Sequence, residues 1–174
     1  MSAVSNIPEK INNFNVYNSG DMLVGITDEV TLPSFEAMTE TISGPGILGE
    51  IESPNVGHFG SMTIEIPFRV LYNDIFEITK ADEGVDITLR GAVQVQSLNS
   101  GKIYKGMRIV MRGMPKTLNI GSAKAGSPMG SSVILELLYI MIEVDGNKKI
   151  ELDKLNNVYK INGTDYLVKI KSLC

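Results

Sequence analysis

Apolar and polar residues alternate along much of the chain, and this period of two is typical of a β-strand with one buried face. Residues 62–70 show the pattern most clearly, because every even-numbered position in this run is apolar. Pro67 interrupts the run and has no amide proton to donate to a neighbouring strand. We therefore expect this strand to lie at the edge of its sheet or to break at the proline.

Two further runs, residues 87–96 and 103–114, alternate in the same way and are separated by turn-forming residues at 99–101. We predict that these two strands pair as a hairpin. In the second run Arg108 and Arg112 fall on one face, and the methionines and an isoleucine fall on the other. The pattern therefore indicates that this strand has one solvent-exposed face and one buried face.

Residues 133–144 are different, because only two glutamates interrupt an otherwise apolar run. Such a strand is expected to be covered on both faces. The Asp-Gly-Asn sequence at 145–147 is a strong hairpin signal and leads into a shorter strand at 148–153. Near the start of the chain, residues 13–17 and 22–31 are predicted to form another hairpin.

Helical signals are confined to two places. Residues 71–80 read as a short helix with Asn73 or Asp74 as its cap. Residues 163–174 carry apolar residues at helical spacing, with lysines late where the helix dipole favours cations. We predict a mainly β fold, a β-sandwich or barrel of antiparallel sheets, with one short internal helix and a C-terminal helix.

Two segments, residues 39–60 and 120–130, fit neither period and are rich in glycine. Loops of this length are uncommon in a compact domain unless they are functional or become ordered on a partner. The length of 174 residues suits one domain, and the chain shows no internal repeat. We therefore predict a single domain, 1–174, with an N-terminal arm at 1–12.

The residues that usually carry catalysis are scarce. The only histidine is His58 and the only cysteine is Cys174, so neither a zinc site nor a Ser-His-Asp site is indicated. The glycine clusters lack P-loop spacing. Carboxylates such as Glu50 and Glu52 are more simply read as exposed strand residues than as a glycosidase pair. We predict that the protein is not an enzyme and has no catalytic residue, cofactor or metal site.

Charge and hydropathy exclude some classes of binding partner. The net charge of −4 argues against a general nucleic-acid binder. Residues 1–15 contain no apolar core of a secretory signal, and the run at 133–144 is too short to span a bilayer. We therefore expect synthesis in the cytoplasm and no membrane insertion.

Specific stretches also resemble a known family. Phe14-Asn-Val-Tyr-Asn18, Leu23-Val-Gly25 and Val30-Thr-Leu-Pro33 resemble the opening of the major tail tube proteins of P2-like contractile phage tails and R-type, phage-tail-like bacteriocins. The C-terminal part carries the more specific match, which consists of Leu135-Glu-Leu137, Tyr139, Glu143-Val-Asp-Gly146, Glu151-Leu-Asp-Lys-Leu-Asn156, Val158 and Asn162-Gly-Thr-Asp-Tyr-Leu167.

This resemblance implies a fold similar to the haemolysin-coregulated protein of type VI secretion. It implies that subunits join their sheets into hexameric rings, and that the rings stack into a helical tube inside a sheath. The implied partners are copies of the chain and the sheath, tape-measure, baseplate and tail-terminator proteins. The resemblance leaves open whether the tube is a conduit for DNA in a phage or the core of a headless bacteriocin particle. Synthesis would take place in the cytoplasm of the bacterial host, before assembly into a virion tail or a released particle.

Under the resemblance, residues 39–60 become an extended segment between subunits and rings. Residues 163–174 become a helix that either contacts a neighbouring subunit or packs against the core of its own subunit. The contact residues predicted for this role are Ile42, Ile47, Leu48, Ile51 and Phe59. The residues predicted to line the lumen are Thr63, Glu65, Thr88, Arg90, Gln94 and Gln96. The strand pattern leaves open which face of the sheet is lumenal.

Two alternatives remain at this point. One is a tube protein of the type VI secretion kind, which the C-terminal match disfavours. The other is a monomeric β-barrel that binds a small ligand in its centre. Particle size separates this second alternative from a tube, because only a tube protein forms rings and stacks.

Overall fold

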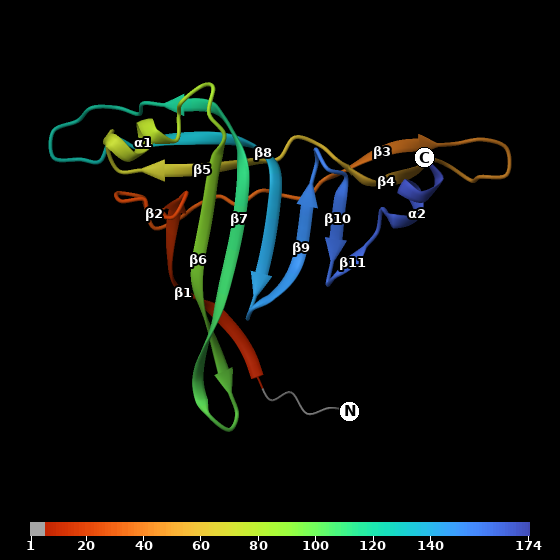
Figure 1. Cartoon of the computed structure of the whole chain (residues 1–174), viewed down its shortest axis with the longest axis horizontal. Helices are drawn as coiled ribbons and strands as arrows, with labels where there is room; N and C mark the ends of the chain where they lie inside the picture. The colour runs from red at the N-terminus through yellow and green to blue at the C-terminus, as the bar shows by residue number, and fades with distance from the viewer. Residues whose placement is uncertain (1–5) are drawn as a thin grey trace.

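The computed structural model describes residues 6–174 as one large antiparallel sheet, a separate two-stranded hairpin and two short helices (Figure 1). The elements in chain order are β1 (Asn6–Asn18), β2 (Asp21–Met22), β3 (Ala37–Ile42), β4 (Ile51–Phe59), β5 (Thr63–Phe68), α1 (Asn73–Glu77), β6 (Val85–Ser97), β7 (Gly101–Asn119), β8 (Ser131–Val144), β9 (Asn147–Asp153), β10 (Val158–Ile161), β11 (Thr164–Asp165) and α2 (Val168–Leu173).

The large sheet has the order β11-β10-β9-β8-β7-β6-β1-β2, and β5 joins it by pairing with β8. The first half of β8 pairs with β5, whereas its second half pairs with β9. In Figure 1, β5 and the first half of β8 lie across the upper end of β6 and β7. The predicted mainly β, antiparallel fold is confirmed, and a single bent sheet supplies both layers of the sandwich.

The core lies between these two layers. Even-numbered residues of β5 and odd-numbered residues of β6 meet there, because alternate side chains of a strand point to the same side. The largest fully buried side chains are Phe68, Met62, Ile64, Ile66, Ile75, Ile78, Ile87, Met111, Leu135, Leu137, Ile140 and Val133. Burial of this apolar surface is the main force that stabilises the fold.

Several predicted strands are confirmed. The hairpin of β6 and β7 is longer than the alternating runs indicated. The turn into β9 places Asp145 and Gly146 at positive φ, 53° and 76°, as a two-residue hairpin turn requires. The strand that contains Pro67 has only β8 as a strand neighbour, and Thr27 N donates to the Pro67 carbonyl at 3.2 Å on its other side.

The N-terminal prediction was wrong in two respects. The first strand begins at Asn6, so residues 6–12 pair with β6 and do not form a free arm; residues 1–5 lie outside the described part. The second strand, predicted at 22–31, has only the two residues of β2. Its pairing ends because Leu23 turns into the core and Gly25 adopts a φ of 83°.

Residues 39–60 are not a loop, because β3 and β4 form an antiparallel hairpin with a turn at 43–50. Four of the seven glycines and prolines of this segment lie in the turn, and three lie in or just after β4, so the alternation of its short strands is interrupted. We call this hairpin the arm (residues 37–59). Within the part of the chain that the structure describes, its two strands pair only with each other, and it projects away from the sandwich (Figure 1).

Both helices are shorter than predicted. The terminal helix covers only Val168–Leu173, because Thr164 and Asp165 first pair with β10 as β11. The internal helix has Tyr72 at its N-cap with no side-chain cap. The carboxylate of Asp74, a predicted cap, instead accepts a hydrogen bond from Val24 N at 2.8 Å.

Candidate functional surfaces

The outer face of the large sheet carries the first candidate surface. We use "outer face" for the side chains of β1 and β6–β10 that point away from the core. Register places Arg90 beside Arg108 and Thr88 beside Val110 on this face. Of the residues predicted to line a lumen, Thr88, Arg90 and Gln96 lie on it.

Charged groups of the outer face are largely paired with one another. Arg108 Nη2 donates to Glu143 Oε2 at 2.8 Å, and Arg112 Nε donates to Asp86 Oδ2 at 2.7 Å. The hydrogen bond to Asp86 raises the pKa of Arg112 above its ordinary value. Within residues 6–174, Arg90 has no carboxylate partner and lies over the Tyr17 ring at 5.3 Å. Most charged groups of this face are therefore paired, whereas Arg90 and Lys102 have no carboxylate partner within residues 6–174.

The tyrosine at the centre of β8 belongs to the same network. Tyr139 OH donates to Glu151 Oε1 at 3.1 Å, and Arg112 lies over its ring at 5.0 Å. Burial and the neighbouring Glu151 raise the pKa of Tyr139. The predicted two-sided cover of β8 is thus only partly present in the single subunit, because Tyr139 and Glu143 remain half-buried on the outer face.

Three lumen candidates do not fit this surface. Thr63 and Glu65 lie on β5, whose even-numbered residues face the same core as the odd-numbered residues of β6. Their side chains therefore point to the opposite outside of the sandwich from Thr88 and Arg90. Gln94 is only 4% exposed, because its amide is hydrogen-bonded to Glu9 and Asn12 of β1. The six residues predicted as one lining do not form one surface.

The arm is the second candidate surface. Ile42, Leu48 and Ile51 are exposed there, as a contact role requires, and Ile47 is partly exposed. Phe59 is different, because its ring packs edge-on against Phe35 and Tyr159, with centroids 6.1 and 5.0 Å apart. It therefore belongs to the base of the arm. Sequence reasoning missed Met38 and Val56, two further exposed apolar residues of the arm that only the hairpin register reveals.

The C-terminal helix extends the apolar surface at the base of the arm. Leu167, at its start, packs against Gly57, where an added Cβ would lie 2.5 Å from the leucine Cδ2. Gly57 also has a φ of 81°, so two constraints favour glycine there. Figure 1 shows α2 and the C-terminus beside β3 and β4. The exposed apolar residues of this terminal segment are Tyr166, Val168, Ile170 and Leu173.

Both edges of the large sheet have few strand pairings among the described residues. At one end β1 runs for 13 residues, and among the described residues its outward side has a strand partner only at Tyr17 and Asn18, which pair with β2. At the other end β11 has only two residues. In the described part of the chain the sheet therefore does not close into a barrel around a ligand. Long open edges favour pairing with another strand.

Features of a catalytic or metal centre are few. In the described part of the chain, no group of three or more His, Cys, Asp and Glu is placed to hold a metal ion. His58 is exposed on β4, and Cys174 is an exposed free thiol at the C-terminus. No helix within residues 6–174 is long and apolar enough to cross a membrane.

Comparison with known proteins defines the class as a structural subunit of phage tails. Residues 8–173 match the family described as phage tail tube protein FII, and the chain belongs to this family. The chain is 26% identical to the tail tube protein of Escherichia phage P2, over 92% of this chain and 94% of that protein. It is 27% identical to the major tail tube protein of Serratia phage KSP20, over 90% of each chain.

The fold has a counterpart among solved structures. The sheath/tube terminator of an extracellular contractile injection system, PVC, solved by cryo-electron microscopy in the extended state, superposes with a TM-score of 0.56 at 14% identity. The match covers 78% of this chain and 96% of that one. The predicted family and the absence of enzymatic function are therefore confirmed: this is a tail tube protein of the contractile type.

Proposed function

We propose that this protein forms hexameric rings that stack into the inner tube of a contractile tail, inside a sheath. The observation that carries the proposal is that, within residues 6–174, most of the outward side of β1 has no strand partner and the far end of the sheet is also uncovered. Leu23 N donates to the Val16 carbonyl at 2.8 Å, which shows that backbone groups of β1 face this side. Pairing the two ends of neighbouring subunits would join their sheets into one closed ring.

In this arrangement the outer face lines the lumen, with Thr88, Arg90 and Gln96 among its residues. Its paired charges support passage of DNA, because arginines already held by carboxylates offer few free cations to phosphates. The same tube would serve as a conduit in a virion and as a puncturing core in a headless particle. The further partners in this proposal are the sheath, tape-measure, baseplate and tail-terminator proteins. The subunit would be synthesised in the cytoplasm of the bacterial host before it assembles with them.

The arm would join successive rings. It is apolar, it pairs only with itself, and it projects from the sandwich, so its side chains remain available to another copy. Exposed apolar groups that gather on one projection mark a contact surface. Many repeated contacts of this kind stabilise a tube even when each contact is weak.

Electron microscopy of the purified protein tests both parts of the proposal. A variant in which an Asn-Gly turn replaces residues 43–50 keeps the Ile42–Ile51 pair of the hairpin and removes the tip. We expect tubes from the unmodified chain and separate rings from this variant. Concentrated protein that stays monomeric would contradict the ring, and long tubes from the variant would contradict the role of the arm.

A further inference from the structure

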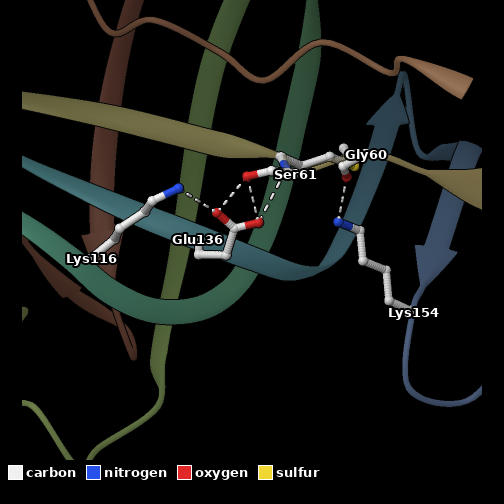
Figure 2. A network of polar contacts seen from close by, with 6 residues as sticks. Gly60, Ser61, Lys116, Glu136 and Lys154 are labelled. Atoms are coloured by element: carbon white, nitrogen blue, oxygen red, sulfur yellow. Dashed lines mark hydrogen bonds and ion pairs between the residues drawn. The ribbon is translucent and has the colours of Figure 1, made fainter. Parts of the chain in front are cut away.

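Three residues, Gly60–Met62, connect β4 of the arm to β5 of the sandwich (Figure 2). We call this segment the link. Gly60 N donates to the Glu36 carbonyl at 3.0 Å, which closes the base of the hairpin. Beyond that base, β3 and β4 pair only with each other, so small changes at the link are magnified along the arm.

One carboxylate connects the link to the sandwich. Glu136, in β8, accepts the Ser61 hydroxyl at 2.7 and 2.9 Å through its two oxygens. Its Oε1 also accepts Met62 N at 3.2 Å, and its Oε2 accepts Lys116 Nζ at 3.1 Å. A single side chain thus joins the link, β7 and β8.

The surroundings make this carboxylate a fixed anchor. Its side chain is 28% exposed, and the adjacent Met62 is buried at 2% exposure. The Met62 carbonyl accepts Leu137 N at 2.8 Å, so both backbone polar groups of Met62 are held by neighbouring atoms of β8. Lys154 Nζ reaches the Gly60 carbonyl from the turn after β9 at 2.8 Å (Figure 2).

We propose that ionised Glu136 is a positioning residue that fixes the direction of the arm relative to the sandwich. The carboxylate is needed because it accepts from a hydroxyl, an amide and an ammonium group at once. A neutral amide in its place would present an N–H group to one of these donors. The inference concerns the single subunit, and only its consequence for stacking rests on the proposed function.

The ionised form is supported by the local chemistry. Partial burial alone would raise the pKa of Glu136, but the hydrogen bonds from Ser61, Lys116 and Met62 outweigh it and leave this pKa below its ordinary value. The charged groups around the link are Lys116 from β7 and Lys154 from the turn after β9. Glu65 of β5 lies on the same side of the strand pair as Glu136.

Two other contacts also hold the base of the arm, and they offer a different explanation of what fixes its direction. The Phe59 ring packs against Tyr159 of β10, and Gly57 packs against Leu167. These contacts attach the arm to the C-terminal segment, whereas Glu136 attaches it to the β5–β7–β8 layer. The two attachments can be separated by substitution.

The test measures arm direction within one subunit, in a Leu48→Asp background that is expected not to stack, with labelled protein diluted into unlabelled protein so that labels on neighbouring copies do not contribute. Spin labels are attached after Thr41→Cys on β3 and Thr88→Cys on β6, in a Cys174→Ser background, and the distance between them is recorded by pulsed electron paramagnetic resonance. We expect one narrow distance in the parent protein and loss of that single distance in both Glu136→Gln and Glu136→Ala. Glu65→Gln is the matched control, because it neutralises a nearby carboxylate on the same side, and it should keep the narrow distance.

The pH profile adds a readout that a merely structural role would not change. We expect the parent distribution to broaden as the pH falls through the lowered pKa of Glu136, and the Glu136→Gln distribution to be broad at every pH. A narrow distance retained in Glu136→Gln, with broadening confined to Phe59→Leu, would overturn the proposal. A mobile arm in a Glu136→Gln variant that still forms tubes would instead leave the positioning role standing and contradict the role of the arm in stacking.

Discussion

The sandwich and the arm are built from similar residues, but they differ in where those residues find partners. In the sandwich, Ile66 of β5, Ile87 of β6 and Ile140 of β8 belong to one core cluster and are at most 2% exposed. In the arm, Ile42 and Ile51 face each other across a hairpin that has no second layer, and both stay about half exposed. An isoleucine therefore stabilises the subunit when it lies in the sandwich, whereas an isoleucine in the arm remains available to contact another molecule.

The first way to test this comparison is to place a carboxylate in the sandwich. Ile140 is 2% exposed within the core of β8. We expect Ile140→Asp to lower the free energy of unfolding by more than about 4 kcal/mol, because an unpaired charge would be buried. Expression in the soluble fraction and urea unfolding measure the effect. A soluble and cooperatively folded variant would refute the burial of this residue.

The second test concerns the bend by which β7 and β8 pass between the layers. Register shifts between Arg112 and Gly113, and an added Cβ at Gly113 would collide with the Glu136 carbonyl. We expect Gly113→Ala to lower the free energy of unfolding by about 1–3 kcal/mol, as overpacking usually does. Thermal unfolding by circular dichroism measures it, with Gly106→Ala as the control, since Gly106 has open space around its Cβ position.

The third test uses pH. The pKa of Glu136 is lower in the folded state than its ordinary value of 4.5. Its contribution to folding is therefore complete above the unfolded pKa, and it is lost as the pH falls through the folded pKa. We expect Glu136→Gln to be less stable than the parent at neutral pH, with the difference shrinking in acid. A difference that is constant with pH would contradict this assignment.

The smallest effect on folding is expected at the tip of the arm. Leu48 is fully exposed, so we expect Leu48→Asp to change the free energy of unfolding by less than about 0.5 kcal/mol. The same substitution should abolish stacking of rings, because it would place a charge in an apolar contact. Urea unfolding and electron microscopy of the same preparation separate the two effects. Normal tubes would show that the tip makes no essential contact.

Sequence patterns predicted the sandwich well because a period of two is a local property. The runs at 87–96 and 103–114 each revealed a strand without reference to the rest of the chain. The arm was missed because β3 has only six residues and precedes a glycine-rich turn. Nothing local in Ala37–Ile42 distinguishes a short strand from an extended loop.

The candidate surfaces were harder to predict, since they depend on register. Alternation shows that one side of β5 and one side of β6 are buried, but it does not show that these sides face each other. For this reason the strand pattern assigns Thr63 and Thr88 to the same lumen lining, although they lie on opposite outer surfaces of the sandwich. The anchor at Glu136 was missed for the same reason, because Ser61 lies 75 residues away in sequence and meets it only through the pairing of β5 with β8.

The internal pairing of Arg108 and Arg112 on the outer face has a consequence for transport. If this face lines a channel, its paired charges neither bind nor strongly repel a polyanion, so the electrostatic resistance to movement through the channel is small. Close ion pairs are screened by salt much less than distant charges are. The speed of passage through such a channel would then depend mainly on the force that drives the cargo and only weakly on ionic strength. Arg90 and Lys102 are among the cations of this face without a carboxylate partner in the described residues, and they would be the points of strongest attraction.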